Sequence, residues 1–142
     1  MPNPKDWRYK FQKAWSWPNS VEKFISSLIF SPSLHVFCGE SSLGDIRVDL
    51  YIDADVKADA FHLPFRDNYF ASVVADPPWH LAYHLRPKLI REIVRVLRPG
   101  GQLIWNCVWW PNSKSIKLTE VWFAKPNTYR TCPIIMVGIK IF

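Results

Sequence analysis

Short blocks of apolar residues, separated by polar turns, recur along the chain and predict the strands of a sheet. Five blocks are predicted to form strands of a mainly parallel sheet: residues 34–38, 47–52, 56–61, 70–75 and 102–109. Two later blocks, residues 120–124 and 134–141, predict an antiparallel strand pair that closes the sheet.

Apolar residues recur with a helical period in two segments, residues 21–30 and residues 86–98. Asn19 or Ser20 can cap the first helix, and Pro87 suits the first turn of the second. The sequence Pro99-Gly100-Gly101 is predicted to end the second helix, with Arg95 and Arg98 near its negative end. The apolar faces consist of Val21, Phe24, Ile25, Leu28 and Ile29 in the first helix, and Leu89, Ile90, Ile93, Val94 and Leu97 in the second.

Strands that alternate with crossovers are typical of an α/β fold. Parallel neighbours usually need a crossover of a dozen or more residues, but Arg47 follows Cys38 and Val56 follows Ile52 too closely for a full helix. Either the crossover helices are shortened to bare loops, or one strand is wrongly predicted. The length of 142 residues predicts one domain, residues 1–142, in which residues 1–30 are an aromatic and basic extension followed by a helix.

Composition and the chain start favour a soluble, intracellular protein, expected in the cytoplasm. No apolar run reaches the roughly 18 residues that a membrane helix needs, and the first residues lack the pattern of a signal peptide. The three cysteines, Cys38, Cys107 and Cys132, form no CxxC pair, so they are expected to be buried apolar side chains. No metal site is predicted, and no Gly-x-Ser-x-Gly turn suggests a serine hydrolase.

Charge divides the chain into an acidic middle and a basic C-terminal part. Residues 31–84 hold eight acidic and three basic residues, whereas residues 85–142 hold ten basic and two acidic residues. A basic flank suits a polyanion such as nucleic acid, and an acidic middle can suit a cationic ligand. The alternative is an ordinary solvated surface with acidic loops.

The sequence Asp76-Pro77-Pro78-Trp79 directly follows the predicted strand 70–75 and carries the clearest chemistry. The lone pair of an aromatic amine is delocalised, so hydrogen-bond acceptors on its N–H groups help it to attack a methyl donor. The Asp76 carboxylate and the Pro77 carbonyl can be these acceptors, the two prolines stiffen the loop, and Trp79 can stack on a base. The alternative is an Asp-Pro turn with Trp79 packed in the core.

Three segments, in the expected order, resemble class I S-adenosylmethionine-dependent methyltransferases. The tetrapeptide resembles the (Asp/Asn/Ser)-Pro-Pro-(Tyr/Phe/Trp) motif of amino-methyltransferases, in the form typical of adenine-N6 enzymes. Residues 59–65, Asp-Ala-Phe-His-Leu-Pro-Phe, and residues 95–101, Arg-Val-Leu-Arg-Pro-Gly-Gly, are similar to two further segments of that family. The resemblance implies a minimal Rossmann-like methyltransferase fold with S-adenosylmethionine as cofactor.

The resemblance also implies roles for individual residues. The turn Cys38-Gly39-Glu40-Ser41-Ser42 would hold the methionine part of the cofactor, although the family's Gly-x-Gly turn is here only Gly39 and Gly44. Asp49 would bind the ribose hydroxyls, with Asp53 as the alternative. Asp59, Ala60 and Phe61 would meet the adenine, while Asp76, Pro77, Pro78 and Trp79 would form the catalytic loop.

His80, Trp109, Trp110 and Asn112 are the candidate substrate-binding residues, because they follow the catalytic motif or the fifth strand. The predicted activity is methylation of an exocyclic base amine in DNA or RNA, first of all adenine N6, with guanine N2 and cytosine N4 as alternatives. A protein glutamine N-methyltransferase and a non-catalytic subunit that binds nucleic acid are the other hypotheses. No target-recognition domain is visible, so specificity is weak or comes from a second copy or a partner subunit.

Overall fold

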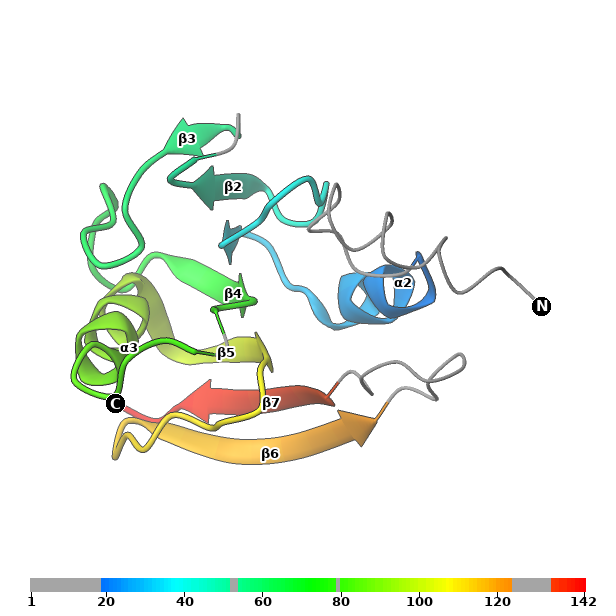
Figure 1. Ribbon diagram of the computed structural model, residues 1–142. Coiled ribbons are helices and arrows are strands. Elements are labelled where there is room, and N and C mark those ends of the chain that lie inside the picture. Colours follow the sequence, from blue (N-terminus) through cyan, green and yellow to red (C-terminus); the bar gives the residue numbers. More distant parts are fainter. Residues whose placement is uncertain (1–18, 52–53, 79, 124–133) are drawn as a thin grey trace.

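The computed structural model describes residues 19–51, 54–78, 80–123 and 134–142, and contains one seven-stranded sheet. Its strands lie in the order β3-β2-β1-β4-β5-β7-β6 (Figure 1). The first five strands are parallel, and β7 pairs antiparallel with both β5 and β6. The elements are α2 (Asn19–Leu28), β1 (Ser33–Val36), β2 (Ile46–Asp49), β3 (Val56–Lys57), β4 (Phe70–Ala75), α3 (Arg86–Val96), β5 (Leu97–Asn106), β6 (Ile116–Phe123) and β7 (Ile134–Lys140). The predicted α/β fold with a closing antiparallel pair is confirmed.

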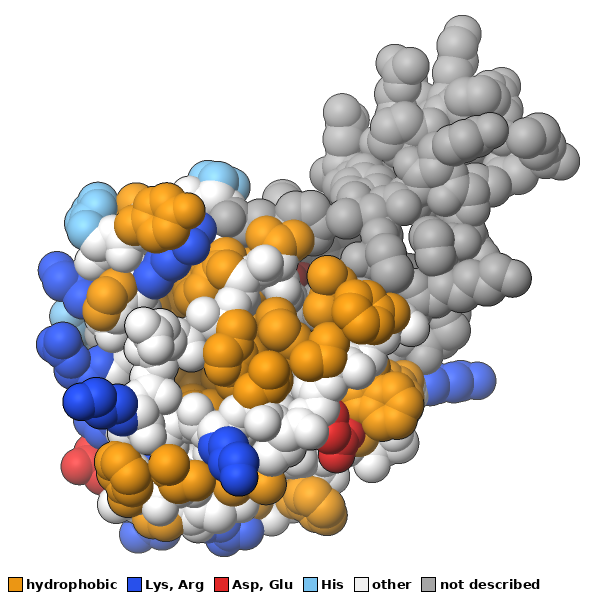
Figure 2. All heavy atoms as spheres, turned by 90° about the horizontal axis from the view of Figure 1, so that it is seen from below, with side chains coloured by type: hydrophobic (Ala, Val, Ile, Leu, Met, Phe, Trp, Pro, Cys, Tyr) orange, Lys and Arg blue, Asp and Glu red, His pale blue; other side chains and the backbone are white. Residues whose placement is uncertain are grey.

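Strand β6 is the outer strand on the C-terminal side, and all of its residues after Ile116 are exposed. Seen from this edge, apolar side chains occupy the middle of the surface, while many Lys and Arg side chains gather on the side where α3 lies (Figure 2). No helix among the described residues combines the length and the apolar character needed to cross a bilayer.

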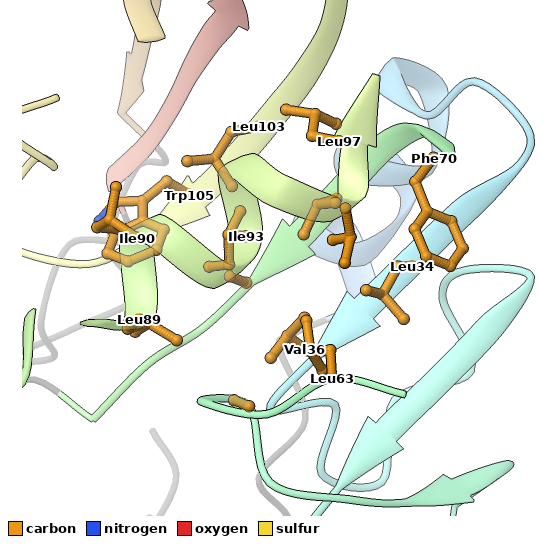
Figure 3. Packing of buried hydrophobic residues seen from close by; sticks show 14 of the residues in the cluster. Leu34, Val36, Leu63, Phe70, Leu89, Ile90, Ile93, Leu97, Leu103 and Trp105 are labelled. Atoms are coloured by element: carbon orange, nitrogen blue, oxygen red, sulfur yellow. The ribbon is translucent and has the colours of Figure 1, made fainter. Parts of the chain in front are cut away.

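The two helices of the described residues, α2 and α3, cover opposite faces of the sheet, as the alternation of side chains along the strands requires. Ile93 of α3 packs in one cluster with Val73, Leu103 and Trp105 (Figure 3). The neighbouring strand residues Val74 and Ile104 point to the other face, where they pack with Ile25 of α2. All six residues of β4 are buried, so the strand that leads to the predicted catalytic loop lies in the centre of the core.

The crossovers on the N-terminal side of the sheet are short, and this settles the alternative left open by the sequence. Residues 37–45 connect β1 to β2 through turns without a helix, and the parallel register Val36↔Val48 shows that both strands are real. Among the described residues, α3 is the one helix that joins two parallel strands of the sheet. The prediction of shortened crossovers is therefore confirmed.

Several predicted boundaries were wrong. The second helix ends at Val96, and Arg98 lies with Pro99-Gly100-Gly101 in β5. Leu97 is extended and pairs with Phe70 of β4, so it belongs to the sheet, and the buried Lys140 ammonium at the end of β7 donates to the carbonyl oxygens of Val94 and Leu97, at 2.7 and 2.6 Å. Three strands end earlier than predicted: β2 at Asp49, β3 at Lys57 and β5 at Asn106. Strand β6 begins earlier than predicted, at Ile116.

Candidate functional site

The parallel pairing of β1 with β4 brings the two most informative loops to one edge of the sheet. Val36 lies opposite Ala75, so the turn that follows β1 and the loop that begins at Asp76 leave the sheet side by side. Strand β2 pairs with the other side of β1 and ends at Asp49. Ligands of open α/β sheets bind at such carboxyl ends, which makes this edge the candidate site.

The turn after β1 has a compact backbone that is bonded to the end of β2. Phe37 and Gly39 have positive φ angles of 57° and 54°, and the Gly39 N–H donates to Asp49 Oδ2 at 3.1 Å. The Cys38 N–H donates to the Val48 carbonyl at 3.2 Å. A buried glycine beside a half-buried carboxylate fits the predicted cofactor position, because a ligand can approach the bare backbone while the carboxylate accepts hydroxyl groups.

The other residues of this turn point in different directions. Burial raises the pKa of the Cys38 thiol to about 11, so this side chain is an inert apolar group. Ser41 is buried, and its hydroxyl donates to Glu22 of α2 at 2.7 Å and accepts from the Leu43 N–H. Glu40 and Ser42 are exposed. The Ser41 hydroxyl thus connects the β1–β2 crossover to α2.

The predicted adenine-side residues lie next to Asp49. The Ala58 N–H donates to the Asp49 carbonyl at 3.2 Å, and this bond places the segment 58–61 beside the end of β2. Asp59 Oδ1 accepts the Phe61 N–H at 2.9 Å, Ala60 is buried and Phe61 is half-buried. The structure therefore brings Asp49, Asp59 and Phe61 into one neighbourhood, whereas Asp53 lies outside the described residues.

The catalytic loop candidate begins in the core and reaches the surface within three residues. Asp76 is half-buried, Pro77 is buried and Pro78 is exposed; Trp79 lies outside the described residues. The Pro78 carbonyl accepts the Leu81 N–H at 3.1 Å, which closes a turn after the motif. Burial raises the pKa of the Cys107 thiol, and the charge of Asp76 raises it further, so Asp76 lies near the end of β5.

The predicted substrate residues gather on the same side. Ala75 pairs with Trp105, so the segment after β5 leaves the sheet beside the Asp76 loop. The buried Trp105 donates from its indole N–H to the Trp109 carbonyl at 2.6 Å, and the two rings are 4.9 Å apart. Trp109 and Trp110 are half-buried, and His80 and Asn112 are exposed. No cluster of three or more His, Cys, Asp or Glu side chains suited to a metal is present among the described residues.

The sequence interpretation missed the role of Arg95. Its guanidinium donates to the carbonyls of Leu63 and Phe65 at 2.9 and 2.7 Å, and to Glu92 and Asp67 at 2.6 and 2.8 Å. Glu92 in turn accepts the Leu63 N–H at 2.8 Å. These hydrogen bonds join two of the three family-like segments, residues 59–65 and 95–101. The occurrence of both segments in the sequence was the available signal that they contact each other.

The sequence analysis also did not predict two exposed aromatic residues near the candidate loops. Tyr51 is 86% exposed, and its N–H donates to Asp49 Oδ1 at 2.9 Å. Tyr83 is 82% exposed, and the Arg86 guanidinium lies 4.1 Å from its ring. Their large exposed rings beside the candidate loops are a feature of the fold that local sequence patterns do not indicate.

Comparison with known proteins defines the class to which this fold belongs. Residues 40–105, from the turn after β1 to β5, match the family model described as "Methyltransferase domain". The fold is that of the Rossmann-like methyltransferases, with a mostly parallel seven-stranded sheet and a C-terminal antiparallel pair. A search by sequence finds no match among curated proteins.

Three similar solved structures illustrate the range of that fold. The 1,6-didemethyltoxoflavin-N1-methyltransferase of Burkholderia thailandensis, with bound S-adenosylhomocysteine, has a TM-score of 0.70 at 11% identity, over 87% of this chain and 79% of that chain. The N-methyltransferase NodS of Bradyrhizobium japonicum, in complex with S-adenosylhomocysteine, has a TM-score of 0.67 at 12% identity, over 86% of each chain. TrmN from Thermus thermophilus has a TM-score of 0.65 at 19% identity, over 86% of this chain and 48% of that chain. This chain thus matches about half the length of TrmN.

Proposed function

We propose that this protein is an S-adenosylmethionine-dependent N-methyltransferase that acts on an exocyclic amine of a nucleic-acid base, first of all adenine N6 in DNA or RNA. One observation carries the proposal. A half-buried carboxylate, Asp76, begins a Pro-Pro loop at the end of β4, next to the Gly39 turn at the end of β1. The match of residues 40–105 to methyltransferase domains and two neighbours named N-methyltransferases support the reaction class and the cofactor.

Each side chain then has a defined task. S-adenosylmethionine, when bound, supplies an electrophilic methyl group. The Gly39 turn holds its amino-acid part through backbone groups, and the Asp49 carboxylate accepts hydrogen bonds from its ribose. Asp59, Ala60 and Phe61 flank its adenine.

On the substrate side, the Asp76 carboxylate and the Pro77 carbonyl accept the two N–H groups of the base amine. This hydrogen bonding localises the nitrogen lone pair, and the negative charge of Asp76 offsets the positive charge that develops on that nitrogen. The stiff Pro-Pro backbone keeps the acceptors in place, which favours in-line attack. Trp79 is the expected stacking surface for the base, and His80 lies at the rim.

A panel of substrates tests this proposal. The purified protein is incubated with labelled S-adenosylmethionine and with single-stranded DNA, single-stranded RNA or a mixture of proteins, and the products are digested to nucleosides or amino acids. The expected product is N6-methyladenosine or its deoxy form. Label in glutamine would favour the protein methyltransferase, and label in no substrate would contradict an enzyme.

A non-catalytic subunit is the second candidate, favoured by the helix-free connection between β1 and β2. Calorimetry with S-adenosylmethionine separates the two functions. The proposed enzyme binds the cofactor with a saturable heat, whereas a protein that binds nucleic acid but shows no cofactor binding at millimolar concentration would be the subunit. A second copy or a partner subunit for target recognition remains a prediction in both cases.

A further inference from the structure

A groove of about 510 Å³ runs between α3 and the segment 109–115. Tyr83, Trp109 and Trp110 provide aromatic walls, and Arg86 and Arg91 provide positive charge. Among the described residues that line the groove, none is acidic. The volume lies in the range typical of ligand sites, and the combination of rings and arginines without carboxylates is suited to a polyanion that carries flat groups.

Arg86 connects the groove to the catalytic loop. Its guanidinium lies 4.1 Å from the Tyr83 ring and 4.4 Å from the Trp109 ring, so an aromatic ring lies close on either flank of the charge. Its Nε donates to the Leu81 carbonyl at 3.0 Å, and the Leu81 N–H donates to the Pro78 carbonyl at 3.1 Å. A ligand that contacts Arg86 is therefore two hydrogen bonds away from the Pro-Pro loop.

The far wall of the groove is held by the sheet. A Cβ added at Gly138 of β7 would lie 2.7 Å from a ring carbon of Trp110, so the indole packs onto the bare backbone of this glycine. Trp109 is held by the buried Trp105, through a hydrogen bond to its carbonyl and a contact between the two rings. The groove is thus preorganised rather than formed by exposed loops alone.

We propose that this groove binds the single-stranded nucleic-acid segment that flanks the methylated base. Arg86 and Arg91 contact its phosphates, and a neighbouring base stacks on the exposed ring of Tyr83. The basic character of the α3 side matches this polyanion (Figure 2). The inference rests on the proposed function and deepens it, because it makes the substrate single-stranded and assigns recognition of the strand to this chain.

Binding of fluorescently labelled oligonucleotides, followed by anisotropy, tests the groove independently of catalysis. The probes are a twelve-nucleotide single strand of DNA, the same sequence in RNA, its duplex, and poly-glutamate of equal charge. Arg91→Glu is expected to weaken single-strand binding at least about tenfold, and Tyr83→Ala at least about fivefold. Arg98→Glu is the matched control, because it makes the same charge change at an exposed residue of β5 outside the groove, and it should change binding less than threefold.

Four results would overturn the groove: no single-strand binding by the wild-type chain, equal losses in Arg91→Glu and Arg98→Glu, equal affinity for duplex, or equal affinity for poly-glutamate. Methylation of free adenosine by the same variants separates this failure from failure of the proposed function. The wild-type chain and Arg98→Glu should methylate the nucleoside at the same rate if the chain is an enzyme. A chain that binds the strand through the groove but methylates nothing would refute the proposed function and leave the groove intact.

Discussion

The sheet differs on the two sides of β1. On one side lie β4, with six buried residues, and β5, with ten residues; on the other side lie β2, with four residues, and β3, with two. The half that carries the predicted catalytic and substrate loops, called the substrate half below, comprises β4, α3, β5 and β7 and is held by apolar packing around Ile93, Leu103 and Trp105. The half that carries the predicted cofactor loops, called the cofactor half below, comprises β1, β2, β3 and their connections. Leu34, Val36 and Val48 pack into the same cluster, but no crossover helix is found among its described residues.

In the cofactor half, several Asp carboxylates accept hydrogen bonds from main-chain N–H groups of the short connections. Asp45 Oδ2 accepts the Ser33 N–H at 2.9 Å, Asp49 accepts the Gly39 N–H, and Asp55 Oδ2 accepts the Arg47 N–H at 2.9 Å. Asp59 does the same for the Phe61 N–H. The acidic middle of the chain is therefore used, at least in part, to satisfy main-chain donors of short loops, which would otherwise be unpaired. Apolar packing thus holds the strand that leads to the predicted catalytic loop, whereas the predicted cofactor loops are held by hydrogen bonds to carboxylates in addition to apolar packing.

The largest effect is expected from Asp76→Ala in the substrate half. Loss of the acceptor should lower turnover about 100-fold to 1000-fold, because the residue acts on the charge that develops in the transition state. Affinity for S-adenosylmethionine should stay within about threefold of the wild type, since the cofactor loops lie on β1 and β2. Single-turnover methyl transfer and calorimetry measure the two quantities, with Glu120→Ala on the exposed strand β6 as the control. A variant that retains full turnover would refute the role of this carboxylate.

Acid is expected to destabilise the cofactor half first. Burial lowers the pKa of His35 from 6.5 to about 4, and its Nδ1 lies 3.2 Å from the carbonyl of Leu43 in the β1–β2 crossover. Between these two pH values the unfolded chain binds a proton that the folded chain does not, so stability falls as pH drops through this window, by about 3 kcal/mol in all.

Urea unfolding at several pH values between 7 and 4 measures this loss, and His35→Gln removes the responsible group. The wild type should lose stability more steeply with falling pH than the variant does. Hydrogen bonds also hold the pKa of Asp45 and Asp55 below the usual range, so their contributions are lost only at lower pH. Parallel curves for the wild type and the variant across this window would show that His35 is not the cause.

Two arginine variants compare the halves directly. Arg95→Gln removes bonds to Glu92, Asp67 and two carbonyls in the substrate half, and should cost about 2–3 kcal/mol. Arg47→Gln removes an ion pair with the exposed Asp55 and a bond to the Ser41 carbonyl, and should cost about 1 kcal/mol or less. Thermal or urea unfolding of both variants gives the order. A larger loss for Arg47→Gln would mean that hydrogen bonding in the cofactor half is worth more than this account allows.

A comparably small effect is expected on cofactor affinity. Asp49→Ala should raise the Kd for S-adenosylmethionine about tenfold, because it removes the ribose acceptor and releases the Gly39 and Tyr51 N–H groups. Asp55→Ala removes a carboxylate from the same half that is bonded to Arg47 instead, and it should change the Kd less than about threefold. Calorimetric titration measures both. Equal Kd values for the two variants would argue that the ribose lies elsewhere.

The sequence predicted the parts of the fold that follow local periodicity. The strand 70–75 was predicted with its actual limits, although Ser72 interrupts its apolar run, and most of the apolar face of each helix was predicted correctly. Val96, which is buried in α3, was not included in the predicted face, and Leu97 lies in β5. The end of α3 was missed because it coincides with the pairing of Leu97 with Phe70 in the sheet, a contact between segments distant in sequence. The contacts of Arg95 with Leu63 and Phe65 were missed for the same reason, although both segments had been singled out.

The candidate site shows the same division. Asp76 could be placed at a strand end from the sequence, because the strand 70–75 was predicted with its actual limits, whereas Asp49 ends β2 but stood inside the predicted strand 47–52. The inward turn of Ser41 toward Glu22 and the stacking of Arg86 on Tyr83 depend on tertiary packing, so no local pattern predicted them. The roles of the individual residues remain predictions.

The most direct test uses an oligonucleotide in which one adenine stands among thymines, so that adenine N6 is the single exocyclic amine of the strand. A second strand carries a purine that lacks this amine in the same position. With labelled S-adenosylmethionine in a single turnover, the account predicts one methyl group on the first strand, recovered as an N6-methyladenine nucleoside, and none on the second. Equal labelling of both strands, or label on a ring nitrogen, would contradict attack by an exocyclic amine held at Asp76.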